Sequence, residues 1–228
     1  MKKLQAVLFD LDDTLYPESE FVFSGFRSVA RWAQETLGYS YEASELRLRE
    51  LFTNGVRRNT FNVWLKEAGN QDVKNIERAI TIYRNHVPEI QPYPEVPLLL
   101  KRLQQTYTLG IISDGVWQVQ ERKLAALGIS SFFTTVIFTD KFGSEFWKPS
   151  PEPFKMALDQ LKVHSSAACY IGDNILKDFK GARIAGLTTI WFRNREGVYS
   201  DSALPSKEHR PEYELHSFAA LEGLLITL

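Results

Sequence analysis

Five short apolar runs, each ending in polar residues, constrain the fold of this chain more than any other feature. They span residues 6–10, 109–114, 135–140, 168–173 and 188–193. Short and nearly continuous apolar runs are typical of strands that are buried on both faces of a sheet. Segments with apolar residues at helical spacing, at 116–127, 151–161 and 174–185, separate the later runs. This alternation predicts an α/β fold built on a Rossmann-like, doubly wound parallel sheet.

Residues 16–93 interrupt the alternation, because only helical patterns occur between the first two strand-like runs. The first of several apolar stripes at helical spacing starts at Phe26. The Pro92-Tyr93-Pro94 segment suits a return linker, since proline restricts both its own backbone and that of the preceding residue. We therefore expect an α/β core made of residues 1–15 and 94–228, with an α-helical cap subdomain, residues 16–93, inserted into the first crossover.

The composition is that of an ordinary soluble globular protein. Of 228 residues, 44% are hydrophobic and 24% are charged, and the net charge is -1, so nothing indicates disorder or a nucleic-acid partner. No apolar run approaches the roughly 18 residues of a membrane helix. The run ending at Phe9 is also too short for a signal peptide. Cys169 is the only cysteine, which excludes an internal disulfide. We expect a cytoplasmic monomer or homodimer without nucleic-acid or membrane partners.

Carboxylates gather at the end of the first strand, in the segment Asp10-Leu11-Asp12-Asp13-Thr14. Two carboxylates held close together resist ionising together, so positive charge must offset their repulsion. A divalent cation is the simplest candidate. In open α/β sheets, ligands bind at the carboxyl ends of the strands. The first fifteen residues therefore indicate a metal-dependent carboxylate site.

Further polar groups follow the other strands. Ser113-Asp114-Gly115 closes the second run, Lys148 precedes the helix at 151–161, and Asp173 closes the fourth run, with Asp178 five residues later. Because the ends of parallel strands meet at one edge of the sheet, these groups should lie together. Clusters of titratable groups of this kind mark functional sites.

This set of motifs resembles the haloacid dehalogenase-like hydrolase superfamily. The family pattern is DxDx[TV], then a Ser or Thr, then a Lys, then GDxxxD or GDxxxxD, and all four occur here in order. The helical insert between the first two motifs is similar to that of the phosphatases with a C1 cap. Residues 113–128, with Gln120 and Lys123, also look like the small phosphatases of that subfamily. The resemblance covers essentially the whole chain and implies hydrolysis of a small phosphorylated metabolite, either a sugar phosphate or a nucleoside monophosphate.

The chemistry of phosphate esters gives these residues roles. Mg2+ screens the repulsion between an anionic phosphoester and a carboxylate. Asp10 is then the nucleophile, which forms an aspartyl-phosphate. The resemblance implies that Asp12 is the general acid and base. It also implies that Asp10, the main-chain carbonyl of Asp12 and Asp173 hold Mg2+, with Asp178 in the outer shell.

The remaining motif residues are expected to bind phosphate or substrate. Ser113 would donate to a phosphoryl oxygen, and Lys148 would stabilise developing negative charge. Thr14 is expected to anchor the turn or support the acid. Asp114 stands where many relatives have Asn, so its ionised side chain would repel phosphate. We therefore expect the backbone N–H groups of Asp114 and Gly115 to make the contact.

Three positions carry open questions. Asp13 replaces the commoner glycine of the first motif, and no role is assigned to it. Arg57 and Arg58 lie at an apparent break between helices of the cap, where they either face an anionic substrate or form an exposed basic turn.

Other functions stay open at this point. A sugar phosphomutase would use the same aspartyl-phosphate but return the phosphoryl group to its intermediate. A metal-independent haloacid dehalogenase would not need an acid at the position of Asp12. A metabolite-binding module without catalysis would tolerate the loss of Asp10 or Asp12, and both are present.

Overall fold

The computed structural model describes residues 3–193 and 197–228. The chain divides into two compact units. The first, called here the core unit, joins the residues up to Glu18 with Gln91–Leu228. The second, the helical insert, is Ser19–Ile90.

A parallel sheet forms the centre of the core unit. In the described residues it has six strands in the order β3-β2-β1-β4-β5-β6, and every neighbouring pair is parallel. The strands are β1 (Ala6–Phe9), β2 (Thr108–Ser113), β3 (Thr135–Phe138), β4 (Ala168–Gly172), β5 (Thr188–Phe192) and β6 (Tyr213–Leu215). Phe9 on β1 lies opposite Ile111 on β2 and Ile171 on β4. The predicted α/β fold is therefore confirmed, and β1 ends between β2 and β4.

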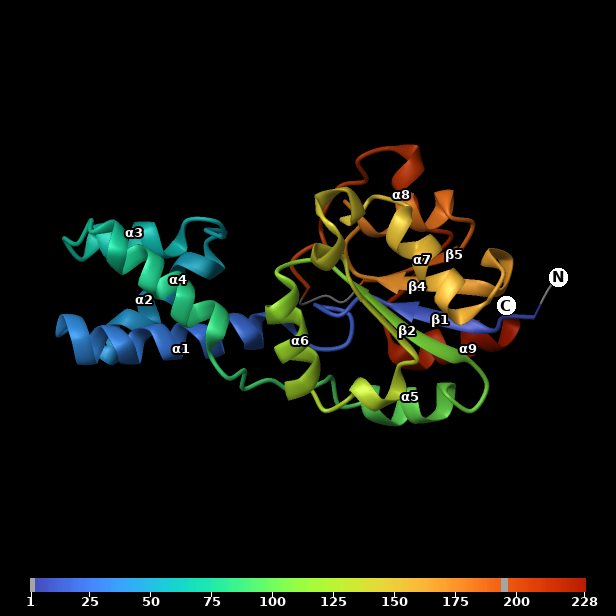
Figure 1. Ribbon diagram of the computed structural model, residues 1–228, viewed down its shortest axis with the longest axis horizontal. Helices are drawn as coiled ribbons and strands as arrows, with labels where there is room; N and C mark the ends of the chain where they lie inside the picture. Colours follow the sequence, from blue (N-terminus) through green and yellow to red (C-terminus); the bar gives the residue numbers. More distant parts are fainter. Residues whose placement is uncertain (1–2, 194–196) are drawn as a thin grey trace. The chain divides into compact units, whose positions relative to one another are not determined.

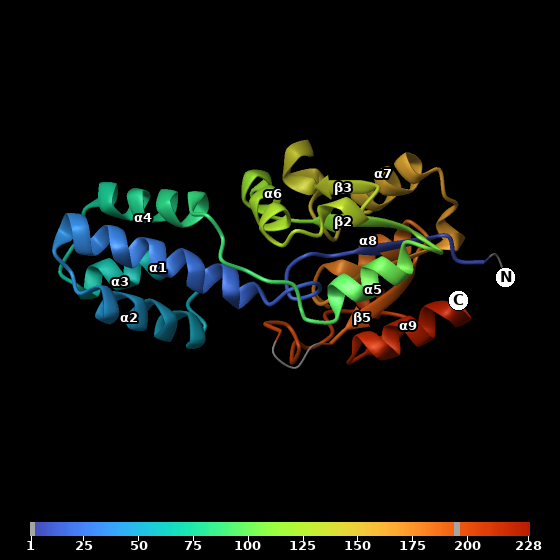
Figure 2. The same cartoon turned by 90° about the horizontal axis from the view of Figure 1, so that it is seen from below.

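Helices cover both faces of this sheet. They are α5 (Val96–Leu103), α6 (Trp117–Ala126), α7 (Glu152–Leu161), α8 (Asp178–Ile184) and α9 (Phe218–Thr227). Figure 1 shows α7 and α8 on one face, and Figure 2 shows α5 and α9 side by side on the other. Helices on both faces explain why the central strands are apolar throughout.

Two parts of the core unit differ from the sequence-based expectation. Strand β6 has only three residues, and its exposed Tyr213 and Glu214 leave no apolar run to signal it. The helix expected from residue 174 begins at Asp178 instead. The side-chain oxygen of Asn174 accepts a hydrogen bond from the backbone N–H of Leu176 at 3.0 Å, which forms a turn before the helix.

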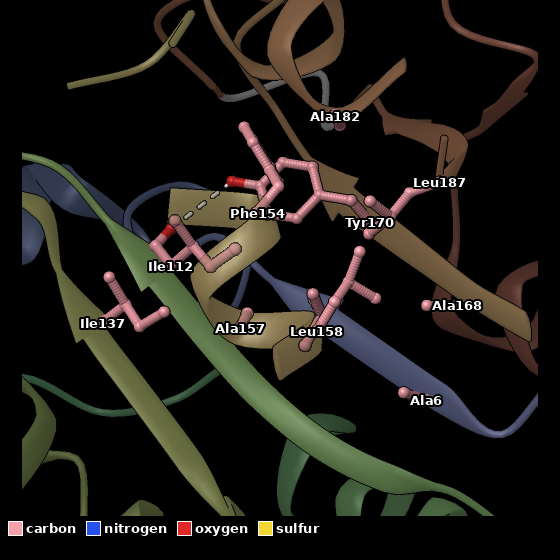
Figure 3. Packing of buried hydrophobic residues seen from close by; sticks show 11 residues of the cluster. Ala6, Ile112, Ile137, Phe154, Ala157, Leu158, Ala168, Tyr170, Ala182 and Leu187 are labelled. Atoms are coloured by element: carbon pink, nitrogen blue, oxygen red, sulfur yellow. Dashed lines mark hydrogen bonds between the residues drawn. The ribbon is translucent and has the colours of Figure 1, made fainter. Parts of the chain in front are cut away.

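A buried apolar cluster packs α7 against the sheet (Figure 3). The rings of Phe154 on α7 and Tyr170 on β4 meet edge to face, with centroids 4.8 Å apart. Complete burial of a side chain of this size contributes roughly 1.5–3 kcal/mol. The Tyr170 hydroxyl, which lies 3.4 Å from the carbonyl oxygen of Ile112, is directed toward the strand ends.

The helical insert has a core of its own. It contains most of α1 (Glu18–Leu37), together with α2 (Tyr41–Thr53), α3 (Thr60–Glu67) and α4 (Val73–Asn85). Phe26, Leu48 and Trp64 are buried at its centre, and Trp32 packs against them from a partly buried position. In the described part of the chain, no helix is both long and apolar enough to cross a membrane.

Helix α8 approaches the loop around Lys148 closely, and a glycine makes this possible. A Cβ atom on Gly181 would lie 2.4 Å from the carbonyl oxygen of Ser150 and 2.5 Å from that of Pro149. Both obstacles are backbone atoms, which cannot move aside as a flexible side chain can.

We therefore predict that Gly181→Ala lowers the free energy of unfolding by about 1–3 kcal/mol, as overpacking does. Gly223→Ala in α9 is the control, because no atom lies within 4 Å of its Cβ position. That variant should be neutral or more stable by up to about 1 kcal/mol. Urea denaturation measures both changes, and equal stability of the two variants would contradict the close approach.

Candidate active site

A pocket of about 370 Å³ opens at the carboxyl ends of the central strands. Its lining is Asp10, Asp12, Asp13, Glu18, Asp114, Gly115, Trp147, Lys148, Asp173, Asn174, Lys177 and Tyr199. Most of the residues expected at the site therefore lie in one place. Ser113, Thr14 and Asp178 are buried next to this lining. The Thr14 hydroxyl has no hydrogen-bond partner among the described residues.

Lys148 lies between two carboxylates. Its ammonium nitrogen is 3.0 Å from Oδ1 of Asp10 and 2.8 Å from Oδ1 of Asp178, and the side chain is completely buried. It also donates to the hydroxyl of Tyr170 at 2.9 Å. Burial alone would lower the pKa of the Lys148 ammonium, but the carboxylates of Asp10 and Asp178 hold this pKa well above its usual value. The lysine is therefore a fixed positive charge beside the expected nucleophile.

The carboxylates of Asp10, Asp173 and Asp178 form a group that could hold a metal ion, with one oxygen of each lying within 4.8 Å of the others. Burial raises the pKa of Asp10 from 3.8 to about 6, although Lys148 opposes this change. Burial and the neighbouring Asp178 also hold the pKa of Asp173 well above its usual value. A hard dication with oxygen ligands would stabilise the ionised form of these buried carboxylates.

The oxygens of Asp178 are already occupied by protein donors. Oδ2 accepts from the backbone N–H of Asn174 at 2.8 Å, and Oδ1 accepts from Lys148. Gly172 leaves room for this arrangement, because a Cβ atom there would lie 2.4 Å from Oδ2 of Asp178. Within the acidic group, Asp10 and Asp173 are therefore better suited to direct contact with a metal ion.

The Asp114 carboxylate forms an ion pair and hydrogen bonds with other protein groups. Its Oδ2 lies 3.1 Å from the ammonium nitrogen of Lys177. Its Oδ1 accepts from the hydroxyl of Thr139 at 2.8 Å and from the backbone N–H of Lys148 at 3.2 Å. Burial would raise the pKa of Asp114, but Lys148, Lys177 and these hydrogen bonds hold the pKa below its usual value. The side chain thus joins the ends of β2 and β3 to the loop before α8.

Asp13 also has a structural position that the sequence did not reveal. Its φ is +50°, in the left-handed region where glycine is favoured and Asp is tolerated. The side chain is buried, and its two oxygens accept from the backbone N–H groups of Glu18 at 2.8 Å and Val198 at 3.1 Å. Asp13, which lines the pocket, therefore connects the first residue of α1 with the turn at Val198.

Asp12 is held by three side chains from two segments. Its Oδ1 accepts from the ammonium of Lys123 at 2.7 Å and from the hydroxyl of Tyr16. Its Oδ2 accepts from Nε2 of Gln120 at 2.7 Å, and the same nitrogen donates to Oγ of Ser113 at 2.7 Å. Burial would raise the pKa of Asp12, but Lys123 and these hydrogen bonds lower it below its usual value.

Several of these partners lie outside the motifs. In the sequence, Gln120 and Lys123 belong to a segment that resembles the small phosphatases, but that resemblance assigns them no role. Tyr16, Tyr170 and Lys177 give no sequence signal of a function, because a tyrosine or lysine near a strand end is common. Their contacts arise only when separate strands and helices come together.

Arg57 contacts another residue of the helical insert, Phe52. Its guanidinium carbon lies 3.7 Å from the centre of the Phe52 ring, and it donates to the carbonyl oxygen of Phe52. Arg58 is exposed. Arg57 therefore packs against Phe52 near the end of α2.

Comparisons with known proteins agree on the family and the fold. The family model for haloacid dehalogenase-like hydrolases matches residues 7–192. Glyceraldehyde 3-phosphate phosphatase of Methanopyrus kandleri is 33% identical over 223 residues, which cover 93% of each chain. Phosphoserine phosphatase of Thermus thermophilus is 28% identical and covers 78% of this chain and 71% of its own. The crystal structure of a 2-haloacid dehalogenase from Pseudomonas syringae superposes with a TM-score of 0.67 at 26% identity, covering 98% of this chain and 99% of its own.

The raised pKa of Asp10 gives a prediction about stability. Below about pH 4 this carboxyl is protonated in both folded and unfolded protein, and the protonated form favours the fold. That contribution is lost as the pH rises through about 6, because the buried group must then ionise. We therefore compare the change in the free energy of unfolding that Asp10→Asn causes in metal-free protein at two pH values. This change should be more favourable to the fold at pH 7.5 than at pH 4, by about 1–3 kcal/mol.

Urea denaturation at both pH values in the presence of a chelator measures this difference. The control is Asp159→Asn, at an exposed position of α7, where the effect should not change with pH. A pH-independent effect of Asp10→Asn would show that burial does not govern this carboxyl.

Proposed function

The chain belongs to the haloacid dehalogenase-like hydrolase family, and we propose that it is a Mg2+-dependent phosphatase for a small phosphorylated metabolite. One observation carries the proposal. Asp10 and Asp12 line one pocket with Lys148 and Asp173, and this is the set that phosphoryl transfer through an aspartyl-phosphate requires. The names of two relatives, glyceraldehyde 3-phosphate phosphatase and phosphoserine phosphatase, support the same reaction.

The proposed reaction has two steps at phosphorus. In the first, an oxygen of Asp10 forms a bond to phosphorus while the ester P–O bond breaks, and Asp12 gives a proton to the departing alkoxide. In the second, water attacks phosphorus, Asp12 takes its proton, and the bond to Asp10 breaks to release inorganic phosphate. Mg2+, when bound, supplies Lewis-acid screening of the charge on the phosphoryl oxygens.

Other residues bind and orient the phosphoryl group in this scheme. Lys148 holds positive charge beside Asp10, where negative charge develops. Ser113 would offer its hydroxyl, and the backbone N–H of Gly115, a residue of the pocket lining, would donate to the phosphoryl group. Asp173 would hold the metal ion directly with Asp10 and the main-chain carbonyl of Asp12. Asp178 would act from the outer shell, since Lys148 and Asn174 occupy its oxygens.

Asp12 separates this reaction from dehalogenation. Halide leaves without a proton, whereas an alkoxide needs one, and a buried network of donors holds the acid at this position. The fold is shared with a 2-haloacid dehalogenase, so the chemistry must be inferred from the site. The proposed substrates are phosphate monoesters. The substrate classes that the family resemblance implies are sugar phosphates and nucleoside monophosphates.

We predict that the protein with Mg2+ releases inorganic phosphate from p-nitrophenyl phosphate, and that Asp10→Asn lowers kcat by at least about 10³-fold, since it removes the nucleophile. A chelator should also stop wild-type turnover, and added Mg2+ should restore it. Phosphate release is measured directly. Full activity of Asp10→Asn would exclude Asp10 as the nucleophile, and full activity without metal would exclude the metal requirement.

A panel of metabolites identifies the substrate class. It should contain glyceraldehyde 3-phosphate, phosphoserine, hexose phosphates and nucleoside monophosphates. We expect many turnovers of free phosphate from at least one of them, with the highest kcat/KM on the preferred class. Isomerisation of a sugar phosphate without phosphate release would instead identify a mutase.

A further inference from the structure

The contacts of Asp12 go beyond what a general acid requires. From the core unit we infer that Tyr16, Gln120 and Lys123 are positioning residues, which fix the Asp12 carboxylate in the orientation that delivers a proton to the leaving group. The inference rests on the proposed function, because it assigns partners to the acid of that reaction. These partners come from the loop after β1 and from α6.

The hydrogen bonds distinguish the two oxygens of Asp12. A carboxylate oxygen has about two lone-pair sites. Oδ1 accepts from both Lys123 and Tyr16, so its sites are filled. Oδ2 accepts from Gln120, the one donor that reaches it in the described part of the chain. The proton exchanged with substrate and water therefore belongs on Oδ2.

Gln120 also sets the distance between acid and phosphate. Its amide nitrogen donates one hydrogen to Oδ2 of Asp12 and the other to Oγ of Ser113, each at 2.7 Å. Ser113 is the expected donor to a phosphoryl oxygen. One amide group thus spans the two groups that must reach opposite ends of the P–O bond being broken. A small error in such a position costs a large factor in rate.

The surroundings make this orientation rigid. Tyr16 is completely buried, and Gln120 and Lys123 are 2% and 4% exposed. The side chain of Asp12 is 21% exposed, because one of its edges faces the pocket. Buried side chains in fixed rotamers can hold a partner within a few tenths of an ångström, as a functional site needs. Solvent-exposed donors would not.

The test is the dependence of kcat/KM on the leaving group, measured with p-nitrophenyl phosphate and phenyl phosphate in excess Mg2+. The nitrophenolate departs readily without a proton, whereas the more basic phenolate needs one. Tyr16→Phe, Gln120→Leu and Lys123→Met should each lower kcat/KM for phenyl phosphate more than for the nitrophenyl ester. We expect the ratio of the two values to fall roughly tenfold for Lys123→Met, a part of the effect of a general acid.

The ratio is independent of the concentration of active enzyme, so partial misfolding does not change it. Matched controls are Tyr107→Phe, Gln118→Leu and Lys155→Met. Tyr107 bonds to the carbonyl oxygen of Leu225, while Gln118 and Lys155 are exposed. These variants should keep the wild-type ratio. Lys123→Arg, which retains the charge, should recover part of the ratio lost in Lys123→Met.

The outcomes separate the inference from the function on which it rests. A wild-type ratio in all three variants of the Asp12 partners would overturn the positioning role while leaving the phosphatase intact. If Lys123→Met does not fold, the smaller changes Tyr16→Phe and Gln120→Leu decide the question. Absence of hydrolysis of both esters by the wild-type protein would overturn the proposed function and the positioning role together.

Discussion

One buried ammonium group holds the candidate active site together. Lys148 contacts Asp10 at the end of β1 and Asp178 at the start of α8, and none of its side chain reaches solvent. A buried ion pair of this kind is costly to break, because removal of one partner leaves an unpaired charge and destabilises a protein by about 3–5 kcal/mol. The end of β1, the start of α8 and the loop that carries Lys148 must therefore come together, and the core packing around Tyr170 and Phe154 supports that geometry.

Three of the six acids that line the pocket have a lysine as counter-ion, and so has the neighbouring Asp178. Lys123 pairs with Asp12, Lys177 with Asp114, and Lys148 with Asp10 and Asp178. Six carboxylates but only two ammonium groups line the pocket itself. Among the described residues, Asp13, Glu18 and Asp173 are the acids of this lining without a lysine ion pair, and burial raises the pKa of each. Asp173 also belongs, with Asp10 and Asp178, to the group that could hold a metal ion, and a dication there would add positive charge.

The sequence predicts those parts of the structure that depend on local pattern. The apolar runs indicate the five longer strands, and the residues at their ends indicate the site, because parallel strands present their carboxyl ends at one edge. The short edge strand β6 lacks such a run. The buried position of Asp13 depends on a left-handed backbone and on Val198, far along the chain. The contacts of Asp12 with Gln120 and Lys123 depend on how α6 packs against β3, and no spacing rule encodes this.

The order of the strands has a consequence for biosynthesis. Ala6 on β1 pairs with Thr108 on β2 and with Ala168 on β4, so the central strand leaves the ribosome long before either neighbour exists. Contacts between residues so distant in the sequence are slow to form, whereas the contacts within Ser19–Ile90 are local. During translation the helices of the insert can form while the apolar β1 segment still has no partner strand. An exposed, unpaired strand of this kind favours aggregation and binding by chaperones. Asp10 gains its counter-ion only after Lys148 has been synthesised.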